Sequence, residues 1–354
     1  SEPTGTPEAS EPQRSPRDIF NPFRFAKSKH PALRWSAWAL LLAVPCAVAG
    51  TLCALFSRCA RAWLVRLFAQ RWEIRLVLDL IVLLAIGVII LWHLKPVNYP
   101  SFDYLFTSTT TTGGDMASHY YTLQYLRDVL LPSGEVSSWT PANYAGFPLL
   151  QFYFPLPFLV MCLMNLVMPL QVAFKWGTLL GTFLLPVAAY LMLRLLRLRW
   201  PAPILAAAST VPFLFNLTNS MWGGNLLSTF AGEFSYSLSF ALSLIFLGSL
   251  YRGCLDNRRV VLNAALVFLV GFSHGYTLLF AEAVSVFLLI TPRGFVRRAV
   301  YLFKVYALGF CFLAFWLVPL LVYSRYTTSY HTAWLLDSAR LVLPKVVWPA
   351  AFFA

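Results

Sequence analysis

The residues best suited to chemistry lie in a polar segment of this 354-residue chain, directly after two glycines. Asp115 follows Gly113 and Gly114, and His119 comes four residues later, whereas the surrounding sequence is mostly lipid-soluble. An ionised carboxylate can accept a proton from a hydroxyl or bind a cation. Positions four apart lie on one face of a helix, so Asp115 and His119 are expected to be one turn apart.

A helix is predicted to begin at Asp115, because apolar side chains recur at about helical spacing after it, at Tyr121, Leu123, Leu126, Val129 and Leu130. The first turn of a helix favours an ionised carboxylate through its free N–H groups and its dipole. The same position is also that of an ordinary N-cap residue. Capping and catalysis are therefore both open for Asp115.

A second acid, Glu233, opens another apolar helix within the segment Gly232–Ser235. It too has two interpretations, as a helix cap or as a reacting group. The turn Trp222–Asn225 precedes it and contains two glycines, which allow backbone N–H groups to approach a ligand. Asn225 is therefore a candidate for substrate binding.

Three further residues are candidates for binding a phosphate group: Arg127, His274 and Arg325. Arginine suits phosphate because its guanidinium donates two parallel hydrogen bonds. His274 lies between two apolar runs, where a structural histidine is the competing interpretation. Arg325 follows the last apolar run, where it would also serve as a head-group anchor.

The composition places these residues in a membrane protein. The chain is 59% hydrophobic, only 12% of its residues are charged, and its mean hydropathy is +0.67, whereas soluble domains carry about 25% charged residues. The run Arg75–Leu94 has the length of one bilayer crossing. Lipid-exposed backbone must form its hydrogen bonds internally, so the predicted fold is an all-α polytopic transmembrane bundle.

The net charge of +13 comes largely from basic clusters in short loops between apolar runs. Such clusters are typical of cytoplasmic loops, because Lys and Arg resist translocation. The charge therefore indicates the lipid bilayer as partner, not nucleic acid. The clusters are Arg194, Arg197 and Arg199; Arg252, Arg258 and Arg259; and Arg293, Arg297 and Arg298.

Three regions are expected along the chain. Residues 1–30 read as a disordered cytoplasmic tail, and residues 31–74 as an apolar hairpin or span followed by an interfacial helix. Residues 75–354 form the membrane module, which is expected to continue beyond residue 354. Its first external loop, at about 95–148, carries short helices. With the basic clusters in the cytoplasm, the segment Leu149–Met168 begins and ends outside and is expected to be re-entrant or to lie in the membrane plane. An ordinary crossing is the alternative.

Motifs for other kinds of site are missing from the sequence. The six cysteines are scattered without CxxC or Cys/His ligand spacing, so neither a disulfide framework nor structural zinc is predicted. We find no Walker, HExxH, GxSxG or dinucleotide glycine motif. Asp115, His119 and Glu233 are candidates for holding a divalent metal ion, and the sequence establishes no cofactor.

Five short segments, in this order, resemble the polytopic GT-C glycosyltransferases. The closest pattern is that of a bacterial membrane protein family labelled as related to 6-pyruvoyl-tetrahydropterin synthase. The resemblance covers roughly Ser108 to Pro319. The segments are Gly113–Asp115, Tyr144–Pro148, Gln151–Pro157, Ala231–Ser235 and Phe272–Tyr276.

The resemblance implies a GT-C fold in the bacterial inner membrane, with the active site on its external face. It implies transfer of a sugar from a polyprenyl-phosphate donor to a glycan, lipid or protein acceptor, with inversion at the anomeric carbon. Asp115 would be the base, Glu233 the second acid, and His274 with Arg127 or Arg325 would neutralise the leaving phosphate. Some such enzymes use a divalent metal. No residue supports the pterin-synthase reaction that the family label mentions.

Two functions of other classes compete with the enzyme. A transporter or flippase of lipid-linked glycans would place ionisable groups at mid-membrane on broken helices. A non-catalytic scaffold subunit would need no reacting group. The acids of this sequence gather near the external ends of the predicted spans, which favours the enzyme.

Overall fold

The computed structural model describes residues 72–94, 103–216, 220–290 and 294–327. The expectations for residues 1–30, for most of 31–74 and for the C-terminal segment after 327 lie outside the described residues. The described chain is mostly helical, as the composition predicts, with two short strands.

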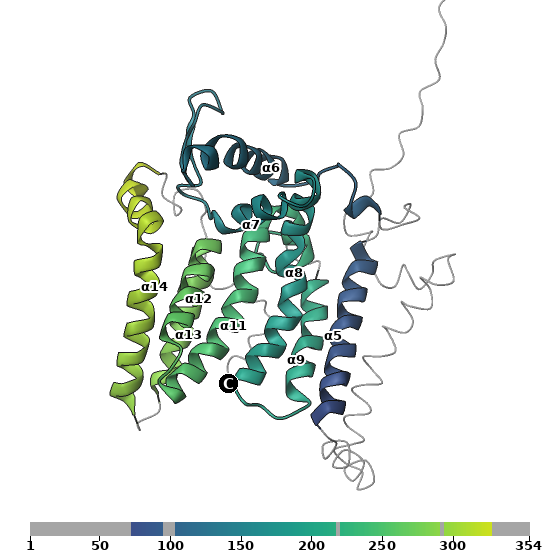
Figure 1. The fold of residues 1–354 in the computed structure, drawn as a ribbon, viewed down its shortest axis with the longest axis vertical. Helices are drawn as coiled ribbons and strands as arrows, with labels where there is room; N and C mark the ends of the chain where they lie inside the picture. The colour runs from purple at the N-terminus through teal and green to yellow at the C-terminus, as the bar shows by residue number, and fades with distance from the viewer. Residues whose placement is uncertain (1–71, 95–102, 217–219, 291–293, 328–354) are drawn as a thin grey trace, which may run out of the picture.

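Within the described residues, four helices are long and apolar enough to cross a membrane. They are α5 (Trp72–Leu94), α8 (Leu170–Leu195), α11 (Phe234–Asp256) and α14 (Phe295–Tyr323). Three shorter apolar helices pack among them: α9 (Ala202–Leu214), α12 (Val260–Ser273) and α13 (Gly275–Ser285), the last extended by η5 (Val286–Leu289). Figure 1 shows these helices side by side in one bundle.

The first external loop of the prediction forms a layer of short elements, and α6 and α7 lie across one end of the bundle (Figure 1). Its elements are η1 (Asp103–Leu105), α6 (Met116–Tyr125), the π-helical turn η2 (Leu126–Leu130) and η3 (Leu131–Ser133). Helix α7 (Leu156–Met164) belongs to the segment that follows the loop. Strands β1 (Ser138–Thr140) and β2 (Phe147–Leu149) pair antiparallel, with Trp139 opposite Pro148.

Helix α7 settles how the segment Leu149–Met168 is arranged. It has 9 residues, which is roughly 14 Å of helix, about half of the ~30 Å hydrocarbon core. It therefore cannot cross, which agrees with the re-entrant or in-plane expectation and not with an ordinary span. Its inner face is packed, because Phe158 and Met161 are fully buried.

Helix α6 follows the predicted apolar pattern in part. Leu123, Leu126 and Leu130 are buried against the bundle, whereas Tyr121 and Val129 of the same pattern are exposed. The switch from α6 to the π-helical turn η2 at Leu126 shifts the buried face, since a π turn holds more residues than an α turn.

The opposite end of the bundle collects the basic clusters. Arg197 and Arg252 both pair with Asp256, with N···O distances of 4.0 and 3.7 Å. The Tyr301 hydroxyl donates to the Arg258 carbonyl oxygen at 2.7 Å. These contacts bring together the ends of α8 and α11 and the starts of α12 and α14, so the predicted cytoplasmic clusters share one end, called here the basic end.

Asp79 ties α5 to this end of α8. Its buried carboxylate accepts hydrogen bonds from the Tyr190 hydroxyl at 2.8 Å and from the Trp200 indole Nε1 at 3.0 Å. A buried acid with two donors is stable without a functional role. A structural role therefore accounts for the burial of Asp79.

Candidate functional site

Asp115 stands at the start of α6, at the end of the bundle away from the basic clusters, and is exposed. It occupies the N-cap position, but its side chain makes no capping hydrogen bond. Its backbone N–H instead donates to the Ala231 carbonyl oxygen at 2.9 Å. The carboxylate is thus not used to cap the helix and remains available to a ligand.

Glycines allow the segment before α6 to touch the segment before α11. Gly114 has φ +46°, and a Cβ there would overlap the backbone of Ala231. Gly232 has φ +127°, and a Cβ there would lie 3.1 Å from both the Asp115 Cβ and the His119 Nε2. Both positions therefore require glycine, for their conformation and for space.

The second predicted acid lies beside the first. Glu233 is half-buried at the N-cap of α11, and its side chain also makes no capping hydrogen bond. It lies close enough to Asp115 for the two charges to interact. The structure therefore brings together two carboxylates from separate segments, and it shows neither of them capping a helix.

His119 forms the buried wall of this cluster. Its side chain is 9% exposed, and its Nε2 lies 3.4 Å from the Tyr153 hydroxyl. Its ring packs against Tyr153 and against Phe234, with both centroid distances 5.0 Å. Burial lowers the pKa of His119 to about 4, although Asp115 and the Gly232 backbone oppose the shift. His119 is therefore neutral at pH 7.

The lowered pKa of His119 predicts a loss of stability in acid. The folded-state pKa, about 4, lies below the reference value of 6.5, so the stabilisation is complete above pH 6.5 and is lost as the pH falls towards 4. Near pH 5 the loss is on the order of 2 kcal/mol. Thermal unfolding of the wild type and His119→Gln, at about pH 7 and pH 5, measures it. We expect the variant to lose less stability on acidification, and equal losses would contradict the assignment.

His274 lies at the break between α12 and α13 and is 8% exposed. Its ring contacts Phe154 at 4.5 Å and Tyr236 at 5.1 Å between centroids, and its Nδ1 has no hydrogen-bond partner. Tyr153 and Phe154 are adjacent, with centroids 5.6 Å apart. They therefore link the two histidines across the segment that enters α7.

The remaining predicted residues are engaged in other ways. Arg127 forms a bidentate pair with Asp128, at 2.5 and 2.7 Å. Asn225 is a buried cap, because its Oδ1 accepts from the Ser228 N–H at 2.9 Å and its Nδ2 donates to the Asn216 carbonyl at 2.7 Å. Arg325 is exposed, with its guanidinium 4.8 Å from the Tyr326 ring centroid. None of these contacts involves Asp115.

Lys175 is a buried cation that the sequence analysis did not select. It is 5% exposed, and its Nζ donates to the carbonyl oxygens of Tyr104 and Thr107, at 2.5 and 2.8 Å. It thereby fixes the threonine-rich stretch that leads to the glycines before Asp115. A single lysine within an otherwise apolar helix was the available signal.

The described residues contain no group of three or more His, Cys, Asp or Glu side chains placed to hold a metal ion. Asp115, His119 and Glu233 lie near one another without forming such a ligand set.

The fold and the site together define a polytopic helical membrane protein with a cluster of acids at one end of its bundle. Residues 150–352, which are 203 of the 354, match the model of the 6-pyruvoyl-tetrahydropterin synthase related domain, described as a membrane protein. The chain belongs to this family. The matched range contains Glu233 and His274 and begins after Asp115. No curated protein and no solved structure gives a significant match.

Proposed function

We propose that this protein is a membrane glycosyltransferase of the GT-C type. It would transfer a sugar from a polyprenyl-phosphate-linked donor to a glycan, lipid or protein acceptor, at the external face of a bacterial inner membrane. The observation that carries the proposal is the exposed, uncapped Asp115 carboxylate beside Glu233, at the end of the bundle opposite the basic clusters. The positive-inside rule supports an external position for that end.

The reaction needs one base and one leaving group. Asp115 takes the proton of the acceptor hydroxyl, whose oxygen forms a bond to the anomeric carbon while the bond from that carbon to the phosphate oxygen breaks. The electron pair leaves with the polyprenyl phosphate, and the anomeric centre is inverted. A general base must come within hydrogen-bond reach of the acceptor hydroxyl, and the Asp115 side chain is exposed where an acceptor can approach it.

Glu233 and His119 complete the site in different ways. Glu233 is half-buried beside Asp115, where it can accept a hydrogen bond from a sugar hydroxyl. His119 is buried and neutral, so it shapes the wall without adding a cation. The side chains around them come from α6, α7 and α11 and from the turn before α13. Four of the five segments in the resemblance thus lie in this one region.

Sugar transfer is tested with the purified full-length protein in lipid nanodiscs. The donor is a polyprenyl phosphate carrying a radiolabelled sugar, with a panel of glycan, lipid and peptide acceptors. Labelled product that depends on the protein is the expected result. If folded protein gives no labelled product with any donor sugar or acceptor, the proposal is overturned.

A transporter of lipid-linked glycans is the second candidate, and one residue favours it. Glu282 on α13 is half-buried in an apolar helix, and its Oε1 has no hydrogen-bond partner. Acids inside membrane helices often mark transport pathways. If the protein is a flippase, Glu282→Gln should slow the movement of a fluorescent polyprenyl-phosphate sugar across proteoliposomes, and Asp115→Asn should not. We expect neither variant to affect such movement.

A further inference from the structure

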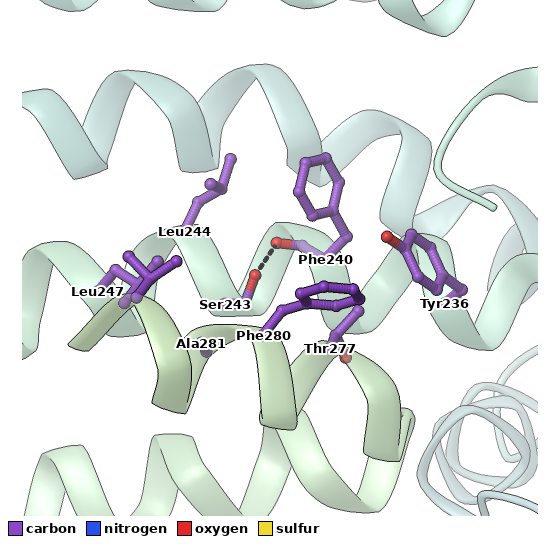
Figure 2. A pocket seen from close by; sticks show the side chains of 9 residues that line it. Tyr236, Phe240, Ser243, Leu244, Leu247, Thr277, Phe280 and Ala281 are labelled. Atoms are coloured by element: carbon purple, nitrogen blue, oxygen red, sulfur yellow. Dashed lines mark hydrogen bonds between the residues drawn. The ribbon is translucent and has the colours of Figure 1, made fainter. Parts of the chain in front are cut away.

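An apolar groove runs along the outside of the bundle between α11 and α13 (Figure 2). It has a volume of about 360 Å³. Figure 2 shows Tyr236 at one end of the row of lining residues and Leu247 at the other. The lining consists of Tyr236, Phe240, Ser243, Leu244 and Leu247 from α11 and of Thr277, Phe280, Ala281 and Val284 from α13.

The lining offers almost nothing to a polar ligand. Ser243 donates its hydroxyl to the Phe240 carbonyl of its own helix, at 2.7 Å. Thr277 donates to the His274 carbonyl oxygen, also at 2.7 Å. Both hydroxyl protons are therefore used within the protein. Apart from the Tyr236 hydroxyl at one end, the groove presents hydrocarbon to its occupant.

The Tyr236 end of the groove reaches the end of the bundle that carries the acid cluster. Tyr236 lines the groove and also packs edge-on against His274, with centroids 5.1 Å apart. It lies three residues after Glu233 on the same helix. The unpartnered Nδ1 of the nine-tenths buried His274 is thus placed where the groove meets the acid cluster. A ligand with an apolar chain and a polar head fits this succession of surfaces.

The size of the groove indicates a single chain. Between Tyr236 and Leu247 it runs roughly 16 Å along α11, at 1.5 Å per residue. A partner helix is about 10 Å wide and needs a longer and wider face. The volume lies at the lower end of the range for small-molecule pockets, which suits one hydrocarbon chain.

We propose that this groove holds the polyprenyl chain of the donor, close to its phosphate. His274, with its Nδ1 protonated and its ring neutral, would donate a hydrogen bond to a phosphate oxygen at the Tyr236 end of the groove. This inference rests on the proposed function, because it takes the donor from there. The donor's hydrocarbon chain would then lie between α11 and α13, and its phosphate would lie beside His274.

The test uses a polyprenyl monophosphate that carries a diazirine in its chain, without a sugar. It is photolysed with the full-length protein in phosphatidylcholine nanodiscs, and the labelled peptides are mapped by mass spectrometry. A phosphatidylcholine with a diazirine in one acyl chain, at the same mole fraction, is the second probe. We expect the polyprenyl phosphate to label the α11 and α13 peptides, and unlabelled polyprenyl phosphate to compete.

Two valines on the same part of the chain provide matched variants. Val284 lines the groove and is 49% exposed, whereas Val286 is 57% exposed and does not line it. Val284→Trp fills the groove and Val286→Trp adds the same side chain beside it. If the Val284→Trp side chain excludes the ligand from roughly 55 Å² of apolar surface, binding weakens about tenfold. We therefore expect Val284→Trp to lower the labelling about tenfold and Val286→Trp to leave it unchanged.

Leu244→Trp fills the groove from the facing wall and should lower the labelling as Val284→Trp does. A folding defect in one of the two variants would then not decide the test. Equal labelling in Val284→Trp and Val286→Trp would overturn the proposal. So would labelling of the same peptides by phosphatidylcholine that polyprenyl phosphate does not displace. Because the probe has no sugar, a labelled groove in a protein without transferase activity would remove the proposed function alone. Transferase activity without groove labelling would remove this inference alone.

Discussion

Asp115→Asn is expected to reduce sugar transfer about 100-fold to 10,000-fold, the range for removal of a general base. The amide is nearly the same size as the carboxylate and cannot accept the acceptor's proton at neutral pH. The fall should appear in kcat, with little change in the KM for the donor, because Asp115 is assigned to the acceptor hydroxyl. Initial rates with the labelled donor in nanodiscs measure both constants.

The variant should fold as the wild type does. The Asp115 side chain makes no capping hydrogen bond, and asparagine is as good an N-cap residue as aspartate. Asp103→Asn provides the matched control, because Asp103 is another exposed acid of the same segment, at the start of η1. Full activity in Asp115→Asn would remove Asp115 as base, and an equal loss in Asp103→Asn would point to a general effect of charge.

The membrane part of the fold can be predicted from local sequence. The apolar run Arg75–Leu94 has the length of a span because the bilayer sets that length, and it appears as α5. The arginine clusters are local as well, and contacts such as Arg197 with Asp256 place them at one end. Helix α7 is short because Pro155 and Pro157 delimit its start, which the sequence also contains.

The candidate site is less accessible to sequence reasoning because its geometry depends on contacts between distant segments. The proximity of Asp115 and Glu233 depends on the hydrogen bond from the Asp115 N–H to the Ala231 carbonyl oxygen. No periodicity predicts such a contact. The pairing of Arg127 with its neighbour Asp128 is local and offered a simpler account than phosphate binding. The engagement of Asn225 by Asn216 is again a matter of tertiary structure.

The histidines show the same limit. Sequence spacing placed His119 one turn from Asp115, which the structure bears out through its packing beside Gly232. It did not predict burial, because the rings that cover His119 come from Tyr153 and Phe234, far along the chain. Burial decides its protonation state. The chemical role of a histidine thus follows from tertiary contacts and not from its position in a helix.

Gly114→Ala is expected to abolish most of the activity while the bundle still assembles. The new Cβ would overlap the backbone of Ala231, and neither backbone can move aside without separating α6 from the start of α11. The hydrogen bond from the Asp115 N–H to Ala231 would then break, and the carboxylate would move away from Glu233. A displacement of about 1 Å in a reacting group can cost on the order of 100-fold in rate, so we expect at least about that loss.

Gly134→Ala is the control that separates this crowding from backbone strain. Gly134 has φ +75°, also in the left-handed region, but nothing lies within 4 Å of a Cβ placed there. Both variants carry the left-handed penalty of roughly 1–2 kcal/mol, and only Gly114→Ala adds the overlap with Ala231. Thermal unfolding should therefore show a small loss for Gly134→Ala and a larger one for Gly114→Ala, and transfer assays should show near wild-type activity for the first alone. Equal activities in the two variants would mean that the contact between Gly114 and Ala231 does not position Asp115, since the strain common to both would then account for the whole effect.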